Sequence, residues 1–232
     1  MGQNQFVAGL TWDEVERRLA STPTAILPVG AAAKEHGWHL PMNTDEIQAN
    51  WLAARLGEYG DSLIWPALTY GFYPAFRDFP GSISLSEPVF VALVREVIGE
   101  ILRWPVSRLI VLNTGISTIR PVETAIALQA WPQPVLHLKV HEGPSYRAAA
   151  AALREQDHGS HADELETSRM LAIAPQAVGM ARAVASPPGP IAGPLTRTNA
   201  PSGTYGKPEL ATLAKGERLN AAMLEDFRGV YE

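Results

Sequence analysis

The segment from Thr24 to Asp45, TAILPVGAAAKEHGWHLPMNTD, joins an apolar run to a loop with many reactive side chains. The apolar run over residues 24–30 predicts a short buried β-strand. Open α/β sheets place their sites beyond the carboxyl ends of their strands, so we expect a functional site in the loop that follows. That loop contains Lys34, Glu35, His36, His39 and Asp45.

The side chains of this loop suit a metal ion, although other roles stay open. Imidazole nitrogens and carboxylate oxygens together favour a borderline divalent metal such as Zn²⁺ or Mn²⁺. However, His36 and His39 lack the spacing of four residues that aligns two ligands on one helix face. Asp45 could instead cap the next helix in a capping box with Gln48, and His39 could be an ordinary loop residue.

Apolar strands and amphipathic helices alternate along the rest of the chain. This alternation predicts a three-layer α/β/α sandwich with a mainly parallel sheet, in a single domain over residues 1–232. In the helix that Thr11 begins, we expect Trp12, Val15 and Leu19 to face inward. The strands are expected at 24–30, 62–68, 108–113 and 133–140, and the helices at 11–19, 45–57, 86–103, 122–130, 145–156, 163–174 and 209–228. Residues 186–208 are rich in Pro, Gly and Thr and predict an ordered irregular segment.

The composition excludes several classes of protein. A net charge of −5 without a basic block argues against nucleic-acid binding. The absence of cysteine excludes disulfides and thiolate ligands. No apolar run approaches the roughly 20 residues of a membrane span, and no secretory signal is apparent. We therefore expect a soluble, cytoplasmic protein.

Several motifs together resemble the creatininase (creatinine amidohydrolase) family. The stretch PVGAAAKEHGWHLPMNTD is similar to its signature PVG-x-x-E-x-HG-x-H-L-P-x-x-x-D, with one extra residue between Gly30 and His36. Further similarities, in matching order, lie at residues 10–14, 79–85, 111–113, 161–168 (HADELETS, for HAG-x-x-ETS) and 203–216. The resemblance implies an α/β fold and a metal-dependent amidohydrolase that acts on a non-peptide C–N bond of a small polar molecule.

The resemblance also implies a metal site. Family members hold two divalent metals bridged by an aspartate, which corresponds to Asp45, and one histidine ligand corresponds to His36. The glutamate of the first motif aligns with Lys34, and Glu35 is one residue away. The expected ligands are therefore Glu35, His36 and Asp45.

The second motif of the family departs from its usual pattern here. Gly115 stands where the resemblance places a histidine ligand, and Ser117 stands where a glutamate can occur. Glycine has no side chain to coordinate, and a hydroxyl is a poor ligand for such metals. We therefore expect at most one divalent ion, Zn, Mn or Fe, per chain. Lys34 could replace a metal electrostatically by pairing with Asp45 or Glu35, or it could be a solvated loop lysine.

The third motif is kept. His161 corresponds to the family's acid–base histidine, and we expect His161 and Glu166 to be catalytic, although Glu166 could simply cap its helix. Three residues could replace lost ligands: His141, Glu142 and Glu164. His137 is expected in the core and His158 on the surface.

The resemblance implies a small-molecule substrate and a homo-oligomer such as a hexamer. The loop at 69–84 supports assembly, because its rings Tyr70, Phe72, Tyr73, Phe76 and Phe79 would form an exposed apolar patch. We expect Phe72, Tyr73 and Phe76 at a subunit contact, although the loop could also pack on its own rings. The alternative function is a metal-free relative that acts as a small-molecule binding or assembly protein.

Overall fold

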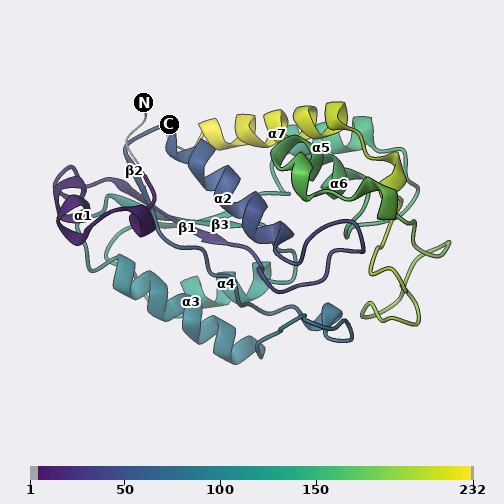
Figure 1. The fold of residues 1–232 in the computed structure, drawn as a ribbon. Coiled ribbons are helices and arrows are strands. Elements are labelled where there is room, and N and C mark those ends of the chain that lie inside the picture. Colours follow the sequence, from purple (N-terminus) through teal and green to yellow (C-terminus); the bar gives the residue numbers. More distant parts are fainter. Residues whose placement is uncertain (1–4, 231–232) are drawn as a thin grey trace.

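Four parallel strands form the central sheet of the computed structural model, which describes residues 5–230 (Figure 1). The strands run in the order β2-β1-β3-β4, and every pair is parallel. Thr24 of β1 lies opposite Ser62 of β2 and Arg108 of β3, and Leu109 lies opposite Val135 of β4. The bounds are β1 (Thr24–Val29), β2 (Ser62–Ile64), β3 (Arg108–Asn113) and β4 (Val135–Lys139). The predicted parallel sheet is confirmed.

Helices cover both faces of this sheet, which gives the expected three layers (Figure 1). One layer contains α2 (Thr44–Gly57), α5 (Pro144–Leu153), α6 (Glu164–Ile173) and α7 (Leu213–Arg228). The other contains α3 (Glu87–Ile101) and α4 (Ile119–Ala127), with α1 (Trp12–Leu19) beside β2. Because neighbouring strand residues point to opposite faces, Ile26 packs in the core of the first layer and Leu27 in that of the second. Across residues 5–230, no helix has the length and apolar character that crossing a bilayer requires.

Most element boundaries agree with the sequence pattern, but α4 was expected at 122–130 and lies at Ile119–Ala127, and α7 was expected from 209 and begins at Leu213. Strand β2 ends at Ile64 because Pro66 has no N–H for the ladder, although Leu68 N still donates to Pro28 O at 2.9 Å. Helix α2 begins one residue before Asp45, so Asp45 lies in the first turn and is not the N-cap. Trp12, expected inward, is 78% exposed, because α1 turns only its later residues toward the core.

The aromatic loop buries most of its rings within its own chain. Tyr73 is 2% exposed and Phe79 is 8% exposed, while Phe72 packs against the core between the sheet and α3. Phe76 lies beside the ring of His161, with centroids 4.3 Å apart. The prediction that these five rings form an exposed apolar patch is therefore wrong. Only Tyr70 is more than half exposed, at 52%. The expected oligomer then depends on the family resemblance alone.

The irregular segment over residues 186–208 reaches the third motif. Tyr205 N donates to His161 O at 2.9 Å, and Ser160 N donates to Tyr205 O at 3.0 Å. Leu195 and Ala200 pack with Phe79 of the aromatic loop. These contacts confirm the prediction of an ordered segment and tie it to the aromatic loop.

We expect Gly216→Ala to destabilise the fold by roughly 1–3 kcal/mol, because it overpacks the contact between α6 and α7. A Cβ on Gly216 would overlap the carbonyl oxygen of Ser168. The control is Gly99→Ala in α3, whose Cβ would lie 3.8 Å from Trp131 and which should gain up to about 1 kcal/mol in helix propensity. Urea unfolding measures both, and equal changes in the two variants would contradict the packing argument.

Candidate active site

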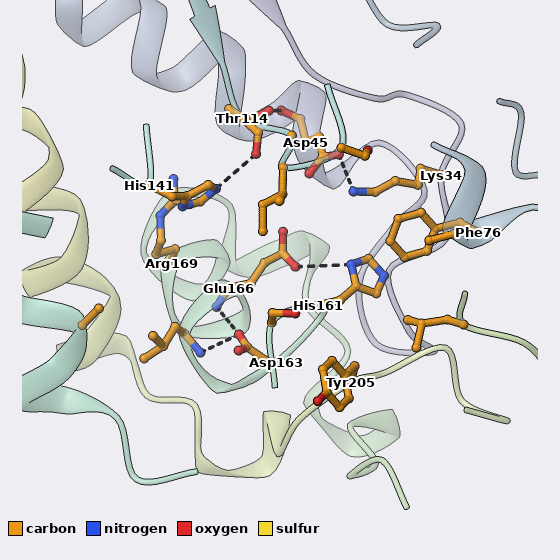
Figure 2. A pocket seen from close by; sticks show the side chains of 18 of the residues that line it. Lys34, Asp45, Phe76, Thr114, His141, His161, Asp163, Glu166, Arg169 and Tyr205 are labelled. Carbon is orange, nitrogen blue, oxygen red and sulfur yellow. Dashed lines mark hydrogen bonds and ion pairs between the residues drawn. The ribbon is translucent and has the colours of Figure 1, made fainter. Parts of the chain in front are cut away.

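A cavity of about 610 Å³ opens where the first loop, the end of β3 and the start of α6 meet (Figure 2). Its wall contains Lys34 and Asp45 from the first loop and the start of α2, Gly115 after β3, and His161 and Glu166 around the start of α6. The cavity therefore lies at the carboxyl ends of parallel strands, where such sheets place their sites.

Lys34 and Asp45 form a buried ion pair on this wall. Lys34 Nζ lies 2.7 Å from Asp45 Oδ2, and the two residues are 6% and 2% exposed. The ammonium also lies 4.9 Å from the centre of the Phe76 ring. Burial raises the pKa of Asp45, but the charges of Lys34 and His36 outweigh it and hold that pKa well below its usual range. Lys34 is thus the counterion of Asp45 and not a solvated loop lysine.

His36 is held between a carbonyl and two carboxylates. Its Nδ1 lies 2.9 Å from Lys34 O, which can only accept a hydrogen bond, so Nδ1 carries the proton. Its Nε2 lies 3.1 Å from Asp45 Oδ1 and 3.9 Å from Glu166 Oε1. Because a neutral ring then presents a lone pair to two anions, either the ring holds a second proton or a cation lies between these groups.

His161 is held in a similar way to His36, but its Nε2 makes the hydrogen bond and its Nδ1 lies near Glu166. Its Nε2 lies 2.7 Å from Glu35 Oε1, while Glu35 Oε2 accepts a 2.9 Å hydrogen bond from Gly37 N. Its Nδ1 lies 3.9 Å from Glu166 Oε2. Since a carboxylate accepts, Nε2 donates to Glu35, and the Nδ1 lone pair faces Glu166.

Glu166 lies between the two histidines and is fixed by the start of α6. Its Oε2 accepts from Ala162 N at 2.7 Å and its Oε1 from Gln48 Nε2 at 3.2 Å. Burial raises the pKa of Glu166, but the charges of His36 and His161 oppose this and lower the pKa to about 2. Glu166 is therefore a carboxylate at neutral pH.

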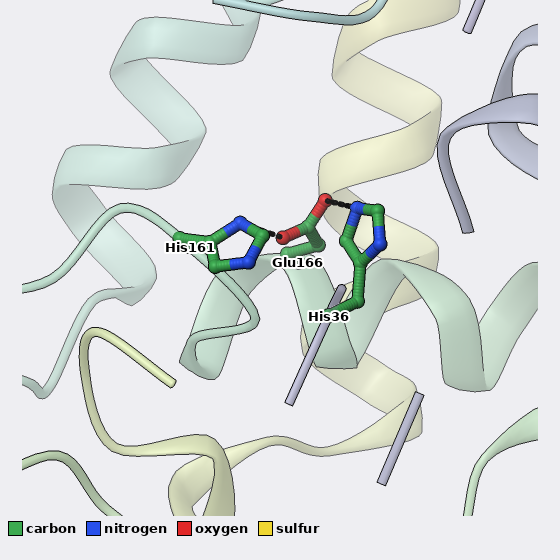
Figure 3. A group of neighbouring side chains, drawn as sticks. All are labelled: His36, His161 and Glu166. Atoms are coloured by element: carbon green, nitrogen blue, oxygen red, sulfur yellow. Dashed lines mark ion pairs between the residues drawn. The ribbon is translucent and has the colours of Figure 1, made fainter. Parts of the chain in front are cut away.

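His36, His161 and Glu166 converge on a common point (Figure 3). One ligand atom from each lies within 4.8 Å of the others. Within residues 5–230, no other group of three or more histidines and carboxylates meets this distance. Of the ligands expected from sequence, His36 and Asp45 are brought together, but Asp45 pairs with Lys34 and Glu35 directs its carboxylate to His161.

The loop after β3 supplies no ligand side chain to this cluster. Gly115 N donates to Asn113 Oδ1, and the Ser117 hydroxyl donates to Phe72 O at 2.8 Å. A Cβ on Gly115 would lie 2.7 Å from Thr118 Oγ1, so the Thr118 hydroxyl occupies the space that a larger side chain needs.

The other candidate ligands have different partners. His141 lines the cavity, but its Nε2 lies 3.1 Å from Thr114 O, and burial, reinforced by the charge of Arg169, lowers its pKa to about 4. Glu142 pairs with Lys139 and Glu164 with Lys215, both away from the cluster. These residues are not part of the close group formed by His36, His161 and Glu166.

His137 and His158 also lie outside the cluster. Burial lowers the pKa of the half-buried His137 in β4 to about 4. His158 is half-buried, with its Nδ1 3.0 Å from Asp157 Oδ1, so it is not fully exposed.

One residue of the site, Arg169, was missed in the sequence, and a second, His39, was left open as an ordinary loop residue. His39 donates or accepts a 2.8 Å hydrogen bond with the Thr167 hydroxyl and so joins the first loop to α6, and burial lowers its pKa to about 4. Arg169 lies on the wall of the cavity. The only sequence signal for Arg169 is its position three residues after Glu166, on the same face of a predicted helix.

A parallel α/β/α sandwich with a buried histidine–carboxylate cluster at the ends of its strands is the architecture expected of a metal-assisted enzyme. The profile of the creatininase family, described as creatinine amidohydrolase, matches residues 8–230, and the chain belongs to this family.

The known relatives cover nearly the whole chain. The creatinine amidohydrolase of Pseudomonas putida is 29% identical over 94% of this chain and 92% of its own length. The mycofactocin precursor peptide peptidase of Mycolicibacterium smegmatis is 27% identical over 94% of this chain and 88% of its own. A crystal structure of creatinine amidohydrolase matches with a TM-score of 0.85 and 26% identity, over 99% of this chain and 97% of that one. The family's characterised activities are consistent with a hydrolase of C–N bonds, and the creatininase neighbours include Zn and Mn structures.

We expect Lys34→Met to lower the free energy of unfolding by about 3–5 kcal/mol, because it leaves the Asp45 carboxylate buried without a counterion. The double variant Lys34→Met/Asp45→Asn should recover part of this loss. Lys139→Met is the control, since it removes a lysine from an exposed ion pair with Glu123, where the loss should be much smaller. Urea unfolding at neutral pH distinguishes the three, and a Lys34→Met protein as stable as Lys139→Met would refute the buried pair.

Proposed function

We propose that this chain hydrolyses a non-peptide C–N (amide) bond of a small polar molecule with one divalent metal ion, Zn, Mn or Fe. The observation that carries the proposal is the orientation of two histidines. His36 directs one N–H to Lys34 O, and His161 directs one to Glu35. The other nitrogen of each ring lies 3.9 Å from a Glu166 oxygen, and that of His36 also lies 3.1 Å from Asp45 Oδ1. Histidines that bind metals commonly donate their other N–H to a carbonyl or a carboxylate in this way.

The proposed ligands are therefore His36, His161 and Glu166. Two histidines and one glutamate form a donor set known from catalytic zinc sites. An ion there would polarise an amide carbonyl and lower the pKa of water. In this proposal Glu35 orients His161 and is not a ligand, and His161 binds metal in place of the acid–base role that the resemblance implied.

The other polar residues of the wall assist in binding the substrate. Lys34 and Asp45 both line the cavity, so the Lys34 ammonium is a fixed positive charge near the cluster, where negative charge develops on an amide oxygen. Phe76 lies against both Lys34 and His161 and limits the access of water to them.

One observation favours the alternative of a metal-free binding or assembly protein. The Lys34 ammonium already neutralises Asp45, and Gly115 and Ser117 offer no ligand. In that alternative His36 carries two protons and donates to both Lys34 O and Asp45. The metal content of the protein decides between the two functions.

We expect elemental analysis of undialysed protein to find no more than one equivalent of Zn, Mn or Fe per chain. His36→Gln and Glu166→Gln should bring the content close to zero, because each removes one of three ligands. His137→Gln should not, since that histidine lies on β4 outside the cavity lining. Two equivalents in the wild type would contradict the single site, and none after reconstitution with Zn²⁺, Mn²⁺ and Fe²⁺ would favour the metal-free alternative.

We expect creatinine hydrolysis to be slower than about 1 per second, the lower end of the usual enzyme range, because the ligands of a second metal are missing. A direct assay with turnover inside the range of about 1–10³ per second would refute this. Restoring the second site should require Lys34→Glu, Gly115→His and Ser117→Glu together with Thr118→Ala, because the Thr118 hydroxyl obstructs a side chain at Gly115. The same set without Thr118→Ala is the matched control and should bind less metal.

A further inference from the structure

Arg169 is a buried cation whose guanidinium makes no hydrogen bond to a carboxylate within residues 5–230. The residue is 1% exposed and lies on α6, three positions after Glu166. Its Nε donates to Asn220 Oδ1 at 3.0 Å, and its Nη2 lies 3.5 Å from Met223 Sδ. Its Nη1 has no hydrogen-bond partner. The carboxylates of Glu166 and Asp45 favour the charged guanidinium through space, but within residues 5–230 neither accepts a hydrogen bond from it.

Such a charge is costly to keep in the interior. An unpaired buried ion destabilises a fold by several kcal/mol, and burial lowers the pKa of Arg169, although an arginine remains charged at neutral pH. The contacts with Asn220 and Met223 join α6 to α7, but an uncharged side chain of similar length could also fill this space. Packing alone therefore does not explain a cation at this position.

Arg169 lies on the wall of the same cavity as His161 and Glu166, two of the proposed metal ligands (Figure 2). Glu166 and Arg169 are three residues apart on one helix, so their Cβ atoms lie about 5–6 Å apart on the same face. A small molecule can therefore reach both side chains at once. Two exposed arginines of α5 and its end, Arg147 and Arg154, line the same cavity and add positive charge.

We propose that Arg169 binds a carboxylate of the substrate through Nη1, so that the substrate class is an amide carrying a carboxylate within a few bonds of the C–N bond, such as an N-acylated amino acid. This inference rests on the proposed function, which places the hydrolysed C–N bond next to His36, His161 and Glu166. The carboxylate supplies the hydrogen-bond acceptor that Nη1 lacks, and the short distance along α6 places the amide next to the cluster.

The test compares two ligands that differ only in charge, hippurate (N-benzoylglycine) and hippuramide, by calorimetric titration of the purified full-length protein. We expect hippurate to bind about 10-fold or more tightly than hippuramide, as for a charge-assisted hydrogen bond in a buried site. In Arg169→Met this preference should vanish, while Arg169→Lys should retain part of it. Arg154→Met is the matched control, because it removes the same charge from an exposed position of the cavity and should leave most of the preference.

The outcomes separate this inference from the proposed function. Equal affinities in the wild type would overturn the carboxylate site, and this comparison needs no variant that could fail to fold. Hydrolysis of both ligands at similar rates, unchanged by Arg169→Met, would also overturn it while leaving the proposed function intact. A preference for hippurate that depends on Arg169, without hydrolysis of either ligand, would support the carboxylate site and count against the hydrolase.

Discussion

The buried ion pair between Lys34 and Asp45 is the constraint on which the site depends. It joins the loop after β1 to the first turn of α2. Both side chains are buried, so an unpaired charge on either one would be strongly unfavourable. The loop cannot rearrange without separating this pair. The positions of Glu35 and His36, the next two residues along the chain, follow from it.

The surrounding backbone reinforces the same geometry. Gly30 has no side chain, which lets the end of β1 approach the carbonyl of Asp45 so closely that a Cβ would overlap it. The Thr114 hydroxyl, just beyond β3, donates to Val29 O at 3.0 Å and holds the second loop against the first. The strand ends, the first loop and α2 thus act as one rigid support for the cluster.

Charge balance relates the ion pair to the chemistry of the cavity. Because the charge of Lys34 is balanced by Asp45, the negative charge of Glu166 must be balanced by the two histidines or by an ion bound between them. Arg169 is the converse case, a buried positive charge whose Nη1 has no hydrogen-bond partner among the described residues. A site with one anion facing two histidines and one unmatched cation nearby suits a ligand that carries both a coordinating oxygen and a carboxylate.

Much of the architecture follows from local pattern. The alternation of strands and helices, the extent of β3 and the ordered segment at 186–208 were all predictable, because burial periodicity and proline positions act over a few residues. The gathering of motifs at one sheet edge was also predictable from parallel topology. Tertiary structure alone decided that Lys34 pairs with Asp45, and that Glu35 contacts His161 across 126 residues. It also buried most of the aromatic rings in their own chain and left the Arg169 Nη1 without a hydrogen-bond partner. These outcomes depend on how distant backbone segments pass one another, which no local spacing in the sequence specifies.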